Sequence, residues 1–151
     1  MEVKEVGSML VCGIKVRTSM SKITEHVGVK PEALMKELAA QEIAPVGPQV
    51  WCYTGCDGTS AEAEFDLLIA IPVSKEGKEQ NGFVFETLPS YRHVSVIHKG
   101  PWSELAAAYE QLVSNIANAG LTLVGTSREI YLNCDFENQQ NCVTEIQMEV
   151  A

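Results

Sequence analysis

The sequence predicts an α+β fold built from two similar β-α-β-β units, related by an approximate twofold axis and joined in an antiparallel sheet. The first observation is an internal repeat, because residues 46–53 (VGPQVWCY) recur as residues 124–131 (VGTSREIY), 78 positions later. The second is that strand-like and helix-like segments follow each other in the same order in both halves. The third is that residues 74–82 (SKEGKEQNG) are polar and contain glycine, as an exposed connector would. We therefore expect one domain over residues 1–151, with unit one at about 1–74 and unit two at about 82–151.

The first unit begins with a strand over 8–17, which is rich in β-forming residues. A short helical stretch is expected from 21, and a helix over 32–40 has Leu34 and Leu38 on one face. Pro31 fits the first turn of that helix. A turn at 45–48, a strand over 49–53, a loop at 56–60 and a strand over 64–73 complete the unit.

The second unit begins with a strand-like segment over 83–99, bent at Pro89. Gly100-Pro101 ends it, and residues 102–119 are expected to form an amphipathic helix with Gly120 just past its end. The apolar stripe of this helix comprises Leu105, Tyr109, Leu112, Val113 and Ile116. A strand over 128–133, a polar loop at 135–141 and a strand over 143–150 follow.

Composition excludes several classes of protein. With 151 residues, 46% of them hydrophobic, the chain can bury one good core. Its 20 acidic and 11 basic residues give a net charge of −9, which repels nucleic acid and anionic lipid, so we expect neither as a direct partner. The N-terminus lacks the pattern of a signal peptide and no apolar run reaches the length of a membrane span. We therefore expect a cytoplasmic protein.

The sequence shows no metal or cofactor signature. The five cysteines form no C-x-x-C pair and have no histidine at zinc-finger spacing, so we expect reduced thiols and no metal site. A disulfide between Cys134 and Cys142, across a polar loop, stays open. No P-loop, Rossmann fingerprint, G-x-S-x-G or H-E-x-x-H motif is present, and we expect no cofactor.

The strand at 49–53 and its repeat place large side chains on one face. Because strand side chains alternate, Val50 and Cys52 share one side and Trp51 and Tyr53 the other; the repeat separates Ile130 from Glu129 and Tyr131 in the same way. We expect the helices to cover the aliphatic side and the aromatic residues to converge with Glu129 on the opposite side. Such an aromatic enclosure with one acid suits an organic cation, although aromatic residues on strands also pack in cores.

Two further aromatic residues are candidate ligand contacts. Trp102 follows His98-Lys99-Gly100-Pro101 at the expected start of a helix, where it can form part of the wall of a cleft. The same run also has a purely structural reading, since Gly permits a turn and Pro starts a helix. Tyr91, in the strand-like segment 83–99, completes the candidate ligand-binding set, which comprises Glu129, Tyr131, Trp51, Tyr53, Trp102 and Tyr91.

The order of these motifs resembles the GyrI-like small-molecule-binding superfamily, the effector-binding domain of AraC-type and MerR-type multidrug regulators, which also occurs as stand-alone proteins. The resemblance is carried in the second unit by the run at 98–102, the helix with Tyr109 and Leu112, and the segments 120–121, 124–125, 128–132 and 144–146. In the first unit it is carried by the turn at 46–48 before Tyr53 and by residues 71–73 (IPV). It implies a duplicated β-α-β-β fold with a ligand cleft between the units, aromatic walls and a buried glutamate, which Glu129 matches. Two departures are the C-terminal 147–150 (QMEV), where the family commonly has Pro-Val, and the bulky Trp51, which narrows the pocket.

These observations lead to one preferred function and two alternatives. We expect a stand-alone binder of lipophilic or amphiphilic organic cations that acts by sequestration or by ligand-dependent regulation, since the two repeats leave no helix-turn-helix in the chain. The first alternative is a hydrolase of reactive electrophiles that uses Glu129 as base or acid with Tyr131 or Tyr53. The second is a protein-interaction inhibitor with a topoisomerase-type partner.

Overall fold

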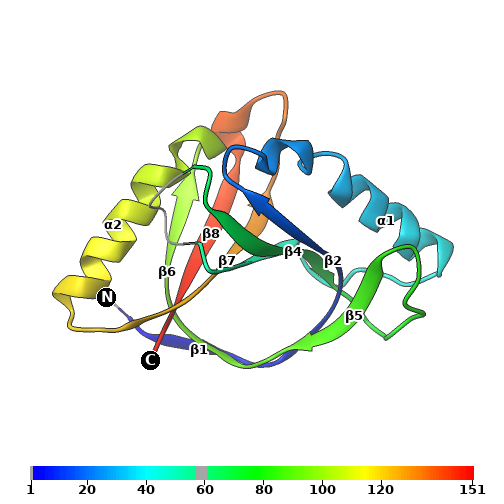
Figure 1. Ribbon diagram of the computed structural model, residues 1–151, viewed down its shortest axis with the longest axis horizontal. Coiled ribbons are helices and arrows are strands. Elements are labelled where there is room, and N and C mark those ends of the chain that lie inside the picture. Colours follow the sequence, from blue (N-terminus) through cyan, green and yellow to red (C-terminus); the bar gives the residue numbers. More distant parts are fainter. Residues whose placement is uncertain (1, 57–60) are drawn as a thin grey trace.

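The computed structural model describes residues 2–56 and 61–151 and contains eight strands, two α-helices and three short 3-10 helices in that part of the chain (Figure 1). The first half comprises β1 (Lys4–Val6), β2 (Met9–Ser19), the 3-10 helix η1 (Ile23–Glu25), α1 (Lys30–Ala40), β3 (Val50–Thr54) and β4 (Glu64–Pro72). The predicted loop at 56–60 lies mainly outside the described residues. The short strand β1 was not predicted, because three residues carry too little pattern.

The second half comprises β5 (Phe83–Leu88), β6 (Tyr91–Lys99), η2 (Trp102–Glu104), α2 (Leu105–Asn118), β7 (Leu123–Asn133), η3 (Gln139–Asn141) and β8 (Val143–Val150). The expected bend at Pro89 is a full break between two strands. The helix expected from 102 begins as a 3-10 turn, and β7 begins earlier than the predicted residue 128. Within the described residues no helix is long and apolar enough to cross a membrane.

All eight strands belong to one antiparallel sheet with the order β1-β6-β8-β7-β3-β4-β2-β5. Strands β1 to β4 of the first half correspond to β5 to β8 of the second. Exchanging each strand with its counterpart gives the same order, read from the opposite edge of the sheet. The sheet therefore has the predicted pseudo-twofold symmetry, and the α+β class is confirmed. Each edge strand pairs with the other half of the chain: β1 of the first half pairs with β6, and β5 of the second half pairs with β2.

The two helices lie on the same side of the sheet, over its outer strands. In Figure 1 they occupy the upper side of the view, while the β1–β2 and β5–β6 segments cross below. Helix α1 packs on β2 and β4, with Leu34 and Leu38 in one core cluster, and α2 packs on β6, with Leu112 and Ile116 in another. The central strands β3 and β7 are therefore left uncovered between the helices.

The predicted assignment of the two sheet faces is wrong. Trp51 and Tyr53 cluster with Leu67 and Ile69, on the same face of β4 as Ile71, which belongs to the core under α1. The opposite face carries a smaller cluster of Val11, Leu68, Ala70 and Leu88, with Cys52 packed against it. The physical reason is that the helices flank the central strands, so the helix side has room for large side chains at β3 and β7.

Candidate functional site

The site is centred on a cross-strand pair at the pseudo-twofold axis. Strands β3 and β7 are antiparallel neighbours, and Trp51 lies directly opposite Glu129 in their register. The same two residues correspond to each other in the 78-residue repeat. A pair that is both cross-strand and symmetry-related must lie on the axis, so the position at which the units differ most in chemistry is the middle of the sheet.

The Glu129 carboxylate accepts hydrogen bonds from three tyrosine hydroxyls. Tyr131, two residues further along β7, donates to Oε1 at 2.7 Å, and Tyr53, its repeat counterpart on β3, donates to the same oxygen at 3.4 Å. Tyr109 on α2 donates to Oε2 at 2.5 Å. Trp51 meets the Tyr131 ring edge to face, with 5.4 Å between ring centroids. The sheet and one helix thus converge on a single carboxylate.

Burial dominates the electrostatics of this cluster. Glu129 is 6% exposed, and loss of hydration raises its pKa, although the three phenol hydrogen bonds partly oppose that shift. Burial also raises the pKa values of Tyr53, Tyr109 and Tyr131, and the negative charge of Glu129 raises them further. The tyrosines therefore stay protonated donors. The ion pairs found among the described residues do not include Glu129, so its charge has no basic side chain as partner there.

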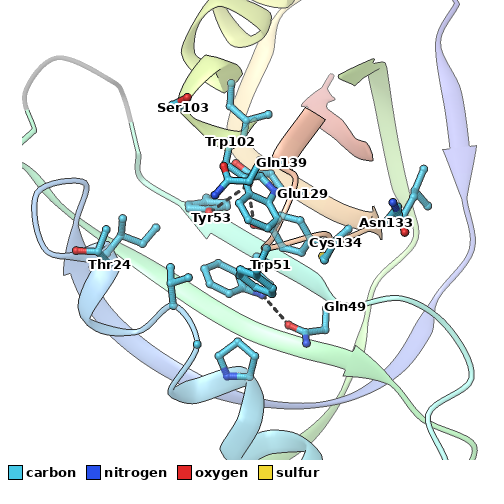
Figure 2. Close-up of a pocket in the computed structure, with 18 of the residues that line it drawn as sticks. Thr24, Gln49, Trp51, Tyr53, Trp102, Ser103, Glu129, Asn133, Cys134 and Gln139 are labelled. Atoms are coloured by element: carbon cyan, nitrogen blue, oxygen red, sulfur yellow. Dashed lines mark hydrogen bonds between the residues drawn. The ribbon is translucent and has the colours of Figure 1, made fainter. Parts of the chain in front are cut away.

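A cavity of about 1060 Å³ opens above this cluster, between α1 and α2. Figure 2 shows Trp51, Tyr53 and Glu129 at its centre, Trp102 entering from the second unit and Thr24 from the first, with Trp51 Nε1 donating to Gln49 Oε1 at 3.1 Å. The first-unit residues that line it are Met20, Ile23, Thr24, Val27, Gly28, Pro31, Glu32, Met35, Gln49, Trp51 and Tyr53. The second-unit residues are Trp102, Ser103, Leu105, Ala106, Tyr109, Glu129, Tyr131, Leu132, Asn133, Cys134, Phe136 and Gln139.

Five of the six candidate ligand contacts line this cavity, namely Trp51, Tyr53, Trp102, Glu129 and Tyr131. The sixth, Tyr91, lies on the opposite face of the sheet. Its hydroxyl donates to the carbonyl oxygens of Thr126 and Gln147 at 3.3 Å each, and the Arg128 guanidinium lies 3.9 Å from its ring centroid. Tyr91 is therefore not brought together with the other candidates.

Tyr109 is the residue bonded to Glu129 that sequence reasoning missed. It was assigned to the apolar stripe of the helix at 102–119, and Leu112 and Ile116 of that stripe are indeed buried. Its hydroxyl was the available signal, since it is the one polar group on a stripe of otherwise aliphatic residues and a buried phenol requires a partner. Among the described residues, no group of three or more His, Cys, Asp or Glu side chains is placed to hold a metal ion.

Comparisons with known proteins agree with this architecture. The family model described as "GyrI-like small molecule binding domain" matches residues 1–151. A search of curated proteins finds no match. Among solved structures, the C-terminal domain of EcmrR is similar with a TM-score of 0.83 and 24% identity, covering 99% of this chain and 96% of that one. In the structure of EcmrR with DNA the TM-score is 0.85 at 21% identity, and the similarity covers 99% of this chain but 56% of the EcmrR chain.

Two further similar structures are a ligand complex and a protein described as a hydrolase. SAV2435 bound to tetraphenylphosphonium has a TM-score of 0.66 and 15% identity, with 99% of this chain and 93% of that chain covered. A protein from Listeria innocua described as a hydrolase has a TM-score of 0.68 and 13% identity, with 99% and 91% covered. At these identities the structural likenesses show the shared fold, whereas the family match spans the whole chain. The chain therefore belongs to the GyrI-like small-molecule-binding domain family.

Proposed function

We propose that this chain binds lipophilic organic cations in the cavity between α1 and α2, with Glu129 as the counter-charge. The observation that carries the proposal is a carboxylate that is 6% exposed, lines a cavity and accepts three tyrosine hydrogen bonds, with no ion-pair partner found among the described residues. Burying such a group is costly unless a cation compensates it. The binding of tetraphenylphosphonium by the similar protein SAV2435 supports the same ligand class.

The surrounding rings suit a cation that carries little hydration. Trp51, Tyr53 and Tyr131 lie beside Glu129, and an aromatic face attracts a desolvated cation by up to about 2 kcal/mol. An arriving cation also favours the ionised form of Glu129, whose pKa burial raises. Binding and ionisation of the carboxylate are therefore coupled.

The biological role that we propose is sequestration of such cations or ligand-dependent regulation. EcmrR, which occurs in a complex with DNA, supports a regulatory role for this type of domain, but the present chain spans 56% of its length. Both roles require the same binding step, so the cavity is the part to test first.

Intrinsic fluorescence provides a local assay, because both tryptophans of the chain, Trp51 and Trp102, line the cavity. Tetraphenylphosphonium and the neutral triphenylphosphine oxide are titrated into wild type, Glu129→Gln and Glu110→Gln. Glu110 is exposed on α2 beside Tyr109 and does not line the cavity, so it controls for the change in net charge.

We expect Glu129→Gln to weaken phosphonium binding well over tenfold, because a unit charge at about 5 Å contributes about 3 kcal/mol at an effective dielectric constant of about 20. Glu110→Gln should bind as wild type does, and the neutral compound should not distinguish the three proteins. Equal phosphonium affinity in wild type and Glu129→Gln would remove the charge argument.

A second candidate function is hydrolysis of reactive electrophiles, which is favoured by one observation. Glu129 has a raised pKa and a tyrosine hydroxyl at 2.7 Å, an arrangement that can pass a proton to or from a reacting group. In this reading Glu129 activates water and Tyr131 donates the hydrogen bond that positions it. The similar Listeria innocua protein described as a hydrolase supports this alternative. Loss of an added electrophile with wild type but not with Glu129→Gln would establish it, and unchanged electrophile would exclude it.

A further inference from the structure

The two sides of the cavity differ in chemistry although the units are related by symmetry. We define the aromatic wall as Trp102, Tyr109 and Phe136, from η2, α2 and the segment before η3, and the aliphatic wall as Met20, Val27 and Met35, from the segment 20–35. At the 78-residue shift Trp102 corresponds to Thr24, and Tyr109 to Pro31. Two aromatic side chains of the second unit therefore have non-aromatic counterparts in the first.

The negative charge of the cavity lies at the axis and is hydrogen-bonded to the aromatic wall through Tyr109. Tyr109 holds Glu129 Oε2 at 2.5 Å, and Trp102 packs against Phe136 with 5.2 Å between ring centroids. Among the described residues that line the cavity, the other charged side chain is Glu32. Glu32 is exposed and pairs with Lys36 at 3.4 Å, so it leaves the aliphatic wall without an unpaired charge.

The aliphatic wall leaves large apolar side chains open. Met20, Val27 and Met35 are 48%, 41% and 40% exposed. Met35 is on helix α1, whose Leu34 and Leu38 are buried against the sheet. Helix α1 thus directs its leucines to the core and Met35 to the cavity. Unbranched methionine side chains adapt to flexible apolar partners.

From this asymmetry we infer that the ligand is an amphiphile, with a flat, delocalised cation against the aromatic wall beside Glu129 and an alkyl chain over the aliphatic wall. This inference rests on the proposed function and specifies the ligand class. A compact cation would leave the aliphatic wall uncovered, since the cavity of about 1060 Å³ is at the upper end of the range for drug-sized ligands. An alkyl chain covers that surface without requiring any hydrogen bond.

The test is a series of N-alkylpyridinium ions from butyl to decyl, followed by tryptophan fluorescence at concentrations below those at which the longer ions aggregate. We expect affinity to rise about three- to fourfold per methylene, the change that burial of one CH₂ produces. In Val27→Ser/Met35→Ser this dependence should flatten, so that decylpyridinium loses at least about tenfold in affinity while butylpyridinium changes little. Both replaced residues are partly exposed, so the double variant should fold.

The control variant is Val29→Ser, since Val29 is 62% exposed close to Val27 but does not line the cavity. It should keep the wild-type dependence on chain length. Affinity that is independent of chain length, or an unchanged dependence in Val27→Ser/Met35→Ser, would overturn the inference. Tetraphenylphosphonium separates the two proposals. If it binds through Glu129 while the alkyl series is flat, only the amphiphile inference fails, and if neither compound binds, the proposed function fails as well.

Discussion

Replacing Glu129 with glutamine should stabilise the fold at neutral pH even as it weakens cation binding. Glutamine keeps Oε1 as an acceptor for Tyr131 and Tyr53, and its Nε2 can donate to the phenol oxygen of Tyr109, so the contacts survive without a charge. The raised pKa shows that the cost of burying the carboxylate exceeds what its hydrogen bonds return. We expect a gain of about 1–2 kcal/mol, within the cost of an incompletely compensated buried polar group.

The pH dependence of this gain identifies its cause. Because the folded-state pKa of Glu129 is raised above its unfolded value, its contribution to stability is fully present below the unfolded pKa and is lost as pH rises through the folded pKa. Glutamine does not titrate, so the advantage of Glu129→Gln should grow with pH.

Urea denaturation of both proteins between about pH 4 and 8 measures the difference directly. Near neutral pH the thermal midpoint should rise by roughly 2–8 °C, given about 2–4 °C per kcal/mol for a chain of this size. A variant that is less stable than wild type at neutral pH, or a difference that does not change with pH, would refute the reasoning.

Three other predictions concern Glu129, Tyr91 and Gly13. Cation affinity should fall as pH falls through the raised pKa of Glu129, and binding near that pKa should release protons. Calorimetry in buffers of different ionisation enthalpy detects the released protons, and binding that is independent of pH would contradict this prediction. Tyr91→Leu should lower the free energy of unfolding by about 1–3 kcal/mol, because it removes the hydrogen bonds of the hydroxyl and the contact of the ring with Arg128. It should leave phosphonium affinity unchanged, since Tyr91 lies on the opposite face of the sheet; a change in affinity would place Tyr91 in the site. Gly13→Ala should lower the free energy of unfolding by about 1–3 kcal/mol, since the added Cβ would lie 2.8 Å from the backbone oxygen of Ile69. A variant that denatures at the wild-type midpoint would contradict the close approach of β2 to β4.

Much of the fold could be predicted because the repeat constrains it twice. Each element had to be consistent with its counterpart 78 residues away, which located β3, β4, β8 and both α-helices to within a few residues. The exchange of edge strands could not be predicted in this way. β1 has three residues, and its partner β6 belongs to the other half of the chain, a pairing that no local pattern expresses.

The composition of the site was predictable where it depends on alternation along a strand. Trp51 with Tyr53, and Glu129 with Tyr131, share a face because strand side chains alternate, and that pairing is independent of where the helices lie. The position of the helices, and hence the contribution of Tyr109, depends on tertiary packing. Tyr91 was assigned to the site without such an argument. It lies three residues from Val94, which packs under α2, so alternation along β6 places Tyr91 on the other face.

The axis explains why the two units cannot be identical at their centre. Residues 51 and 129 are directly opposite each other, so two glutamates there would bury like charges side by side, which is destabilising and would force one of them to stay protonated. Two tryptophans would leave the cavity without a charge. An acid in one unit and an aromatic residue in the other provide one carboxylate and one apolar surface at the same point. Two further differences, Tyr109 against Pro31 and Trp102 against Thr24, place aromatic side chains on the second unit's side of the cavity, and Tyr109 donates a hydrogen bond to that carboxylate.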